Sequence, residues 1–177
     1  VIRKYFKYRD PKDGRLVLKE DEKALYHLLD KGMEEFRSMG DVYLSESMKN
    51  WKIMETPTVS AGVSAYTGWL ELTVDMGEFP KEELGRILAA YSQKKKYYRL
   101  KSGEFLQLGE GGLYTVARLA KELGISRKEL QSRAVSLPAY RAMYLDSVLK
   151  EGPGVAYYRD QLMKALVRGL RSVEDSD

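Results

Sequence analysis

Two runs of alternating residues joined by a glycine turn constrain the fold of this chain more than any other feature of its sequence. The first run, T-V-S-A-G-V-S-A-Y, covers residues 58–66, and the second, W-L-E-L-T-V-D, covers residues 69–75. Alternation of apolar and polar side chains with a period of two is typical of β-strands. Because only T-G separates the two runs, they predict an antiparallel hairpin.

Two further hairpins are predicted elsewhere in the chain. Residues 1–19 are rich in tyrosine and basic residues, and their central sequence D-P-K-D-G favours a turn between two strands. Residues 97–100 and 104–108 form the second predicted pair of strands, around an S-G turn. We also expect a short strand, V-Y-L, to begin after Asp41.

Helical periodicity covers much of the remaining chain, with apolar residues recurring at three- and four-residue steps. Ser126 and Glu129 have the spacing of a capping box, which predicts a short helix directly after Ser126. The expected helices cover residues 20–39, 45–51, 80–94, 113–123, 127–131, 138–149 and 159–170.

These elements indicate an α+β fold class, in which short antiparallel hairpins are interleaved with amphipathic helices. The sequence shows neither a regular β-α-β alternation nor a repeat of fixed period. Its 177 residues suit one large domain or two small ones. We expect one α+β region over residues 1–155, which could divide into two subdomains near residues 77–80, followed by a helix and an acidic tail over residues 156–177.

The composition excludes several kinds of reactive site. The chain has no cysteine and a single histidine, His27, so a disulfide framework, a thiolate zinc site and a cysteine nucleophile are excluded. His27 lies beside the apolar face of a predicted helix, which is the usual place of a packed or surface histidine. We therefore expect no metal site in this chain.

The sequence also lacks the motifs of nucleotide chemistry. Its most glycine-rich stretch, L-G-E-G-G-L, has no lysine after the last glycine, and Glu110 inside it would repel phosphate. The acidic clusters at residues 20–22 and 82–83 fall in the first turns of predicted helices, where negative charge is favourable in any protein. We therefore expect the chain to have no cofactor and not to be an enzyme by itself.

The net charge is +4 and the isoelectric point is near 9.0, so the chain is mildly basic. No apolar run approaches the roughly 20 residues that cross a bilayer, and no segment has the pattern of a signal peptide. The chain begins at Val1 rather than at methionine, so we expect a piece of a longer protein. The simplest expectation is a cytoplasmic location without a membrane partner.

Two basic segments that contain tyrosines are candidate nucleic-acid sites. Cations bind phosphates without regard to base sequence, and tyrosine rings can stack on exposed bases. The structural alternative is a solvated charge run with tyrosines packed inward, or an ordinary edge strand protected by lysines. The candidates are Lys94, Lys95, Lys96, Tyr98, Arg99 and Lys101 in one segment and Arg3, Lys4 and Lys7 in the other.

Several segments resemble the bacterial Swi/Snf helicase-associated family. The stretch K-K-Y-Y-R-L-K-S-G-E-F-L-Q-L at residues 95–108 is similar to that family's pattern K-K-Y-Y-R-L-K-[DS]-G-x-F-L-x-L. The central hairpin, the segment E-E-L-G-R-I-L-A-A-Y and the segment L-P-A-Y-R-A-M-Y-L-D-S-V-L at residues 137–149 agree with it in the same order. The resemblance covers most of the chain from Asp41 onward and is weaker before it.

The resemblance implies an accessory region that precedes a two-lobed ATPase motor in the same chain. The motor's motifs are absent from these residues, so the resemblance supplies no catalytic residue here. ATP and magnesium are expected only for the motor, which would move along duplex DNA. The expected function is an accessory module that assists nucleic-acid engagement or regulates the motor.

The alternative is a protein–protein docking module that never touches DNA, because tyrosine and arginine are also enriched at protein interfaces.

Overall fold

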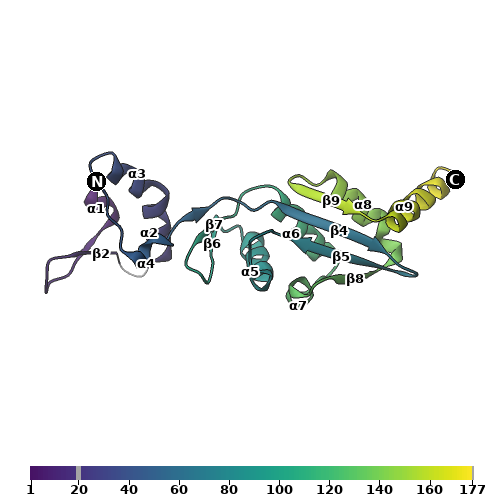
Figure 1. The fold of residues 1–177 in the computed structure, drawn as a ribbon, viewed down its shortest axis with the longest axis horizontal. Helices are drawn as coiled ribbons and strands as arrows, with labels where there is room; N and C mark the ends of the chain where they lie inside the picture. The colour runs from purple at the N-terminus through teal and green to yellow at the C-terminus, as the bar shows by residue number, and fades with distance from the viewer. Residues whose placement is uncertain (19–20, 177) are drawn as a thin grey trace. The chain divides into compact units, whose positions relative to one another are not determined.

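The computed structural model describes residues 1–18 and 21–176 (Figure 1). The chain forms two compact units, one of Val1–Glu55 with Arg99–Gln107 and the other of Thr56–Tyr98 with Leu108–Asp177. Lys19 and Glu20, at the predicted end of the first hairpin and the predicted start of the first long helix, lie outside the described residues. The predicted single region over residues 1–155, with its division near residues 77–80, stays a prediction.

The first unit begins with a helical turn where a strand was predicted. Helix α1 (Ile2–Tyr5) precedes the short strands β1 (Tyr8–Arg9) and β2 (Leu16–Val17), which pair antiparallel. The hairpin is therefore confirmed over β1 and β2, but the prediction of a strand from Val1 is wrong. The packing of Tyr5 gives the physical reason, because this side chain is buried in the helical turn. The centroid of its ring lies 5.3 Å from that of His27 and 5.7 Å from that of Phe36.

The first long helix is confirmed as three consecutive segments. They are α2 (Glu22–His27), a π-helical turn η1 (Leu28–Gly32) and α3 (Met33–Arg37). Asp21 caps the start, since its carboxylate accepts the N–H groups of Lys23 and Ala24. A Cβ on Gly32 would lie 3.0 Å from the Tyr5 ring, so this glycine permits the close approach of α1.

The rest of the first unit is short and mostly irregular. The helical turn α4 (Glu46–Lys49) is confirmed, whereas the strand predicted after Asp41 is wrong and the chain there is irregular. Strand β3 (Ile53–Met54) pairs in parallel with β7 (Phe105–Gln107). Strand β6 (Tyr97–Arg99) begins in the second unit, and only Arg99 belongs to the first. The predicted turn from β6 to β7 is confirmed, because Leu100 donates its N–H to the Glu104 carbonyl.

The second unit is built on a four-stranded sheet with the order β8-β5-β4-β9. The predicted central hairpin is confirmed as β4 (Val59–Ala65) and β5 (Trp69–Asp75), which pair antiparallel in full register. Strand β8 (Val135–Pro138) adds antiparallel to β5, and strand β9 (Val155–Arg159) adds parallel to β4. Neither β8 nor β9 was predicted.

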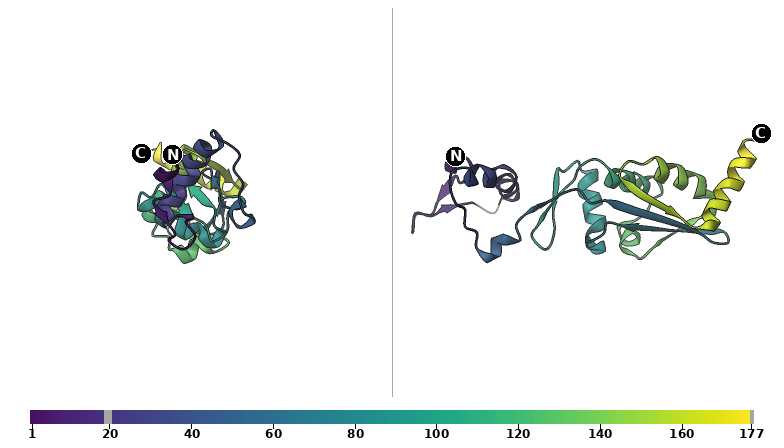
Figure 2. Two further views of the ribbon diagram at one scale, coloured as in Figure 1. Left: turned by 90° about the vertical axis from the view of Figure 1, so that its left-hand side faces the viewer. Right: turned by 45° about the horizontal axis from the view of Figure 1, so that its top comes forward.

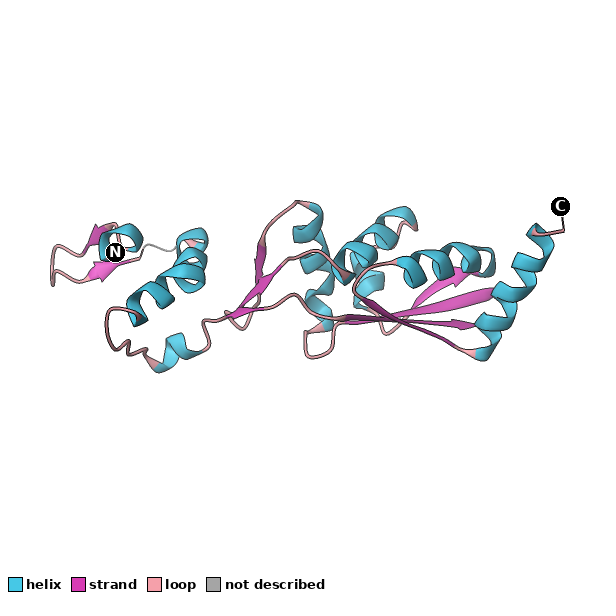
Figure 3. Cartoon of the chain, turned by 90° about the horizontal axis from the view of Figure 1, so that it is seen from above, coloured by secondary structure: helices cyan, strands magenta, loops and turns pink. Residues whose placement is uncertain are grey.

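One face of this sheet carries the core of the second unit. The alternation of β4 and β5 places Val59, Val63, Leu70 and Leu72 on that face, each with at most 1% of its surface exposed. Helices α6 (Gly112–Glu122) and α8 (Ala142–Glu151) and the final helix α9 (Gln161–Glu174) pack on the sheet and on each other (Figure 3). Helix α5 (Lys81–Ser92) packs on α6 and on α7 (Arg127–Gln131).

The helices of this unit otherwise follow their sequence signals. The capping box before α7 is present, with Ser126 and Glu129 each satisfying the other's backbone N–H. The helix predicted from Pro138 begins as a 3-10 turn (Ala139–Arg141) that continues into α8. Helix α9 starts after Asp160, whose carboxylate accepts the Met163 N–H, and it follows directly on the end of β9 (Figure 2).

The α+β class is therefore confirmed, with one refinement. Strand pairs β3–β7 and β4–β9 are parallel, so the sheets are mixed as well as antiparallel. No helix in the described part of the chain is both long and apolar enough to cross a membrane.

Candidate nucleic-acid interface

The end of α5 places three lysines at the surface through an unusual helix stop. The N–H of Lys95 donates to the Ala90 carbonyl at 3.1 Å and the N–H of Lys94 donates to the Tyr91 carbonyl at 2.9 Å. This is the Schellman arrangement, in which the residue after the cap takes a left-handed conformation and is usually glycine. Here that residue is Lys94, with φ +57°, the one non-glycine residue with positive φ in the described chain.

Helix α6 ends in the same arrangement but with the usual residue. Gly124 has φ +67°, and the N–H of Ile125 donates to the Ala120 carbonyl at 2.8 Å. The contrast shows that this chain uses glycine at one helix end and lysine at the other. A left-handed lysine costs about 1–2 kcal/mol relative to ordinary backbone, and such costs cluster at functional sites.

The three lysines border a surface hollow of about 670 Å³, named here the lysine hollow. Its other wall is α6, whose Arg118 and Lys121 are three residues apart and so share one helical face. Five cations from two elements therefore meet around one concavity. The hollow is lined by Tyr91, Ser92, Lys94, Lys95, Lys96, Leu108, Tyr114, Ala117, Arg118, Lys121 and Glu122.

Most of the positive charge in the lysine hollow is not neutralised by nearby acids. Glu122 lies 3.1 Å from the Nε of Arg118 and offsets that one charge. Among the described residues, no ion pair within 4 Å reaches the three lysines after α5 or Lys121. The hollow therefore keeps a surplus of positive charge that can attract an anionic polymer.

Two tyrosines give the lysine hollow an aromatic component. Tyr114 is about half exposed, and Tyr91 is partly buried. Burial raises the pKa of the Tyr91 phenol, and the charges of Glu110 and Tyr114 raise it further. Both observations suit a site where a neutral phenol can donate a hydrogen bond and an exposed ring can stack on a base.

The structure gives Tyr98 a different environment from these two tyrosines. Its hydroxyl donates to Glu83 Oε1 at 3.2 Å, and Glu83 is almost completely buried. Burial raises the pKa of Tyr98, and the Glu83 charge raises it further. Tyr98 is thus half-buried, and its hydroxyl is held by Glu83 within the second unit.

Arg99 and Lys101, also proposed from the sequence, belong to the other unit. The Arg99 guanidinium lies over the Phe105 ring, 5.4 Å from its centroid. Lys101 is exposed and takes part in an interaction of its own. Of the six residues proposed in this segment, the structure brings together Lys94, Lys95 and Lys96 around the lysine hollow.

The N-terminal candidates lie around α1 in the first unit. Lys4 Nζ lies 2.7 Å from Glu35 Oε1, and this hydrogen bond raises the pKa of Lys4. Lys4 and Lys7 border a second hollow of about 720 Å³, together with Lys23 and Asp21. Arg3 is exposed on α1 and is not among the residues that line it.

Sequence reasoning missed Arg118, Lys121, Tyr91 and Tyr114. The R-L-A-K sequence in α6 predicts a helix with two cations on its polar face. Such faces are common on ordinary surface helices, so the sequence alone does not indicate a binding site. What makes them part of a site is the packing of α5 on α6, which brings the end of one helix beside the face of the other. No cluster of three or more metal-binding side chains occurs within the described residues.

A family model with the description "Bacterial SNF2 helicase associated" matches residues 1–177, the whole chain. No curated protein and no solved structure matches this chain.

Proposed function

Since this chain belongs to the family of bacterial SNF2 helicase associated domains, we propose that it is an accessory module whose lysine hollow engages the phosphate backbone of nucleic acid. The observation that carries the proposal is the meeting of five cations from two elements around one concavity. In this proposal ATP and magnesium act at the associated motor, and the chain's own residues perform no catalysis.

The chemistry of the hollow suits backbone contacts rather than base readout. Lysine is a compact charge on a flexible stem, so it binds phosphates without the fixed geometry that reads a base edge. Four of the five cations are lysines. We therefore expect affinity that depends strongly on salt and weakly on DNA sequence.

The exposed ring of Tyr114 adds a preference for unpaired bases. A base can stack on a tyrosine only where it is not already stacked in a duplex, and each such contact contributes about 1–3 kcal/mol. The neutral phenol of Tyr91 lies in the same hollow and can donate to a phosphate or sugar oxygen. A single strand or a frayed duplex end should therefore bind more tightly than an intact duplex.

One observation favours the alternative, a docking module for a protein partner. At the turn between β4 and β5 the rings of Tyr66 and Trp69 stack with centroids 4.2 Å apart, and both are exposed. Exposed aromatic pairs of this kind are typical anchors of protein interfaces. This surface could serve motor regulation whether or not the lysine hollow meets DNA.

The two functions differ in their salt dependence. Fluorescence anisotropy with labelled single-stranded and duplex DNA, at low and at physiological salt, measures it directly. The variant K95A/K96A/K121A should lower affinity for all sequences and reduce the slope of log K against log salt by roughly 0.7–0.9 for each phosphate that is no longer bound. The variant K12A/K31A/K128A is the matched control, because it removes three exposed lysines that do not line the hollow.

Unchanged DNA binding in K95A/K96A/K121A would refute the lysine hollow as the site. Absence of DNA binding by the native chain at low salt would favour the docking module instead. In that case the variant Y66A/W69A should weaken binding of the chain to the isolated motor.

A further inference from the structure

A third basic hollow, lined from α8, β9 and α9, shares no residue with the lysine hollow or with the hollow beside Lys4 and Lys7. Its volume is about 450 Å³, and it is named here the arginine hollow. The residues that line it are Lys150, Arg159, Lys164, Val167, Arg168, Arg171, Ser172 and Asp175.

The lysine hollow and the arginine hollow are carried by helices at different ends of β4. Gly112, at the start of α6, lies so close to Val59 that a Cβ there would be 2.7 Å from the Val59 side chain. Asp160, which caps α9, instead accepts the N–H of Ala65 at 3.2 Å. Val59 and Ala65 are the first and last residues of β4, which spans about 20 Å. Figure 1 shows α6 and α9 toward these two ends.

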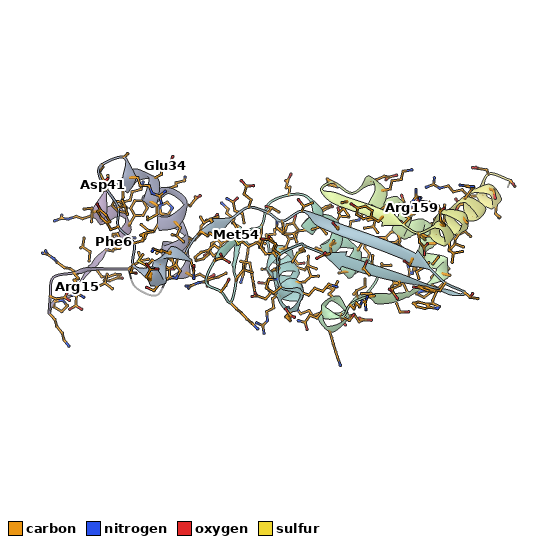
Figure 4. The ribbon with its side chains drawn as sticks, viewed as in Figure 1. Phe6, Arg15, Glu34, Asp41, Met54 and Arg159 are labelled. Carbon is orange, nitrogen blue, oxygen red and sulfur yellow. The ribbon has the colours of Figure 1, made fainter. Side chains whose placement is uncertain are left out.

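A buried carboxylate holds two arginines in place beneath the arginine hollow. Asp146 in α8 has no exposed surface, and its oxygens accept from Arg159 Nη1 at 2.9 Å and from Arg171 Nη2 at 3.2 Å. The hydroxyl of Tyr157 donates to the same carboxylate at 3.1 Å. Arg159 reaches it from the end of β9, next to α9 (Figure 4).

This arrangement fixes geometry and leaves positive charge unneutralised. One carboxylate shared by two guanidinium groups offsets one of their two charges. Each guanidinium has five N–H donors, so its other donors remain available for a ligand. Both side chains are partly exposed, Arg159 at 27% and Arg171 at 49%.

Three further cations surround the clamped arginines. Lys164, Arg168 and Arg171 follow one another at four- and three-residue spacing, so they form one stripe along α9. Lys150 approaches from α8. No ion pair within 4 Å reaches Lys150, Lys164 or Arg168 among the described residues, and the single acid that lines the hollow is Asp175.

We propose that the arginine hollow is a second anion site, which binds a phosphoryl group through Arg159 and Arg171 with support from Lys150, Lys164 and Arg168. Guanidinium groups bind phosphate through two parallel hydrogen bonds, and a buried acid that orients them makes such contacts directional. The phosphoryl group belongs either to a nucleic-acid backbone or to a free phosphate compound. The proposal does not depend on the lysine hollow binding DNA.

The test uses inorganic pyrophosphate as the probe at constant ionic strength. Nitrogen–proton NMR spectra of the arginine Nε–Hε groups report directly on Arg159 and Arg171. Saturable shifts of these two signals are expected in the native chain. The proposal would be overturned if pyrophosphate caused no shift of these two signals. It would also be overturned if the shifts grew linearly without saturation and chloride caused shifts of the same size.

The variant K150A/K164A/R168A removes the supporting cations and leaves the Asp146 clamp in place, so the fold should persist. It should weaken pyrophosphate binding at least fivefold, whereas K95A/K96A/K121A should leave the Arg159 and Arg171 shifts intact. Equal binding by the native chain and K150A/K164A/R168A would contradict the proposal.

A DNA titration separates the two sources of the phosphoryl group. If K150A/K164A/R168A lowers DNA affinity threefold or more while the lysine hollow is intact, the ligand is the nucleic-acid backbone. If DNA affinity stays unchanged while pyrophosphate binding falls, the ligand is a free phosphate compound. A lysine hollow that fails to bind DNA leaves the pyrophosphate result unaffected, so the two proposals fail separately.

Discussion

The backbone N–H of Lys95 donates to the carbonyl oxygen of Ala90 across 3.1 Å, and this bond holds Lys94 in a left-handed conformation. Glycine would satisfy the same turn without the steric cost of a Cβ. The chain does use glycine at the equivalent place after α6, where Gly124 has φ +67°. The lysine after α5 therefore costs stability and adds a charge to the lysine hollow.

Replacing Lys94 by glycine should separate stability from binding. K94G should raise the free energy of unfolding by about 1 kcal/mol, because the left-handed strain disappears, and should weaken DNA binding because one cation is removed. Urea denaturation and fluorescence anisotropy measure the two effects. K94N is the control, since asparagine tolerates this conformation without a charge, and it should weaken binding like K94G. A less stable K94G would contradict the strain argument.

Tyr98 and Tyr114 should respond in opposite ways to substitution. Y98F removes the hydrogen bond to Glu83 and should lower stability by about 1 kcal/mol without changing DNA affinity. Y114A removes an exposed ring from the lysine hollow and should weaken single-stranded DNA binding about tenfold or more, with little change in stability. Weaker DNA binding by Y98F would contradict this prediction and indicate that Tyr98 takes part in DNA binding.

Asp146 should be a strong determinant of stability in the second unit. D146N removes a fully buried charge that accepts from Arg159, Arg171 and Tyr157. Removal of the buried carboxylate should lower the free energy of unfolding by about 3 kcal/mol, because both arginines then lose their charged partner. R171A, whose side chain is half exposed, should cost less. Urea denaturation measures the stability of both variants. An equal loss of stability in D146N and R171A would contradict the role of Asp146 as the shared partner of the two arginines.

Tyr157 should make the chain sensitive to alkaline pH. Burial raises the pKa of this phenol, and the adjacent Asp146 charge raises it further, whereas the unfolded phenol titrates near 10. Its contribution to stability is thus complete below pH 10 and declines as the pH rises above that value, since only the unfolded state then loses the proton. Y157F should show a shallower loss of stability between about pH 9.5 and 11 than the native chain. Parallel pH profiles would contradict this assignment.

The sequence predicted the elements whose signals are local. The alternation of β4 and β5 repeats over seven residues in each strand, and the Ser126–Glu129 capping box needs only four residues, so both were found. Strands β8 and β9 have four and five residues and pair with strands far away in the chain. Nothing within V-S-L-P or V-A-Y-Y-R reveals that partner.

The N-terminal helix shows tertiary packing overriding a local pattern. The alternating V-I-R-K-Y-F-K-Y segment favours a strand, but the burial of Tyr5 against His27 and Phe36 accompanies a helical turn. A segment of four residues has too little intrinsic preference to resist such contacts.

The lysine hollow was half predictable for a similar reason. Lys94, Lys95 and Lys96 are adjacent in the chain, so their charge is visible in the sequence. Arg118 and Lys121 join them only because α5 packs on α6, and the involvement of Tyr98 with Glu83 depends on the same tertiary structure. Which tyrosine is exposed could not be read from K-K-K-Y-Y-R alone.

Binding of nucleic-acid phosphates by the lysine hollow is tested most directly by the salt dependence of DNA affinity. The native chain, K95A/K96A/K121A and K12A/K31A/K128A are measured side by side. We expect a steep slope for the native chain and the control, and a slope smaller by roughly two or more for K95A/K96A/K121A. Identical slopes for all three proteins would contradict phosphate binding in the lysine hollow.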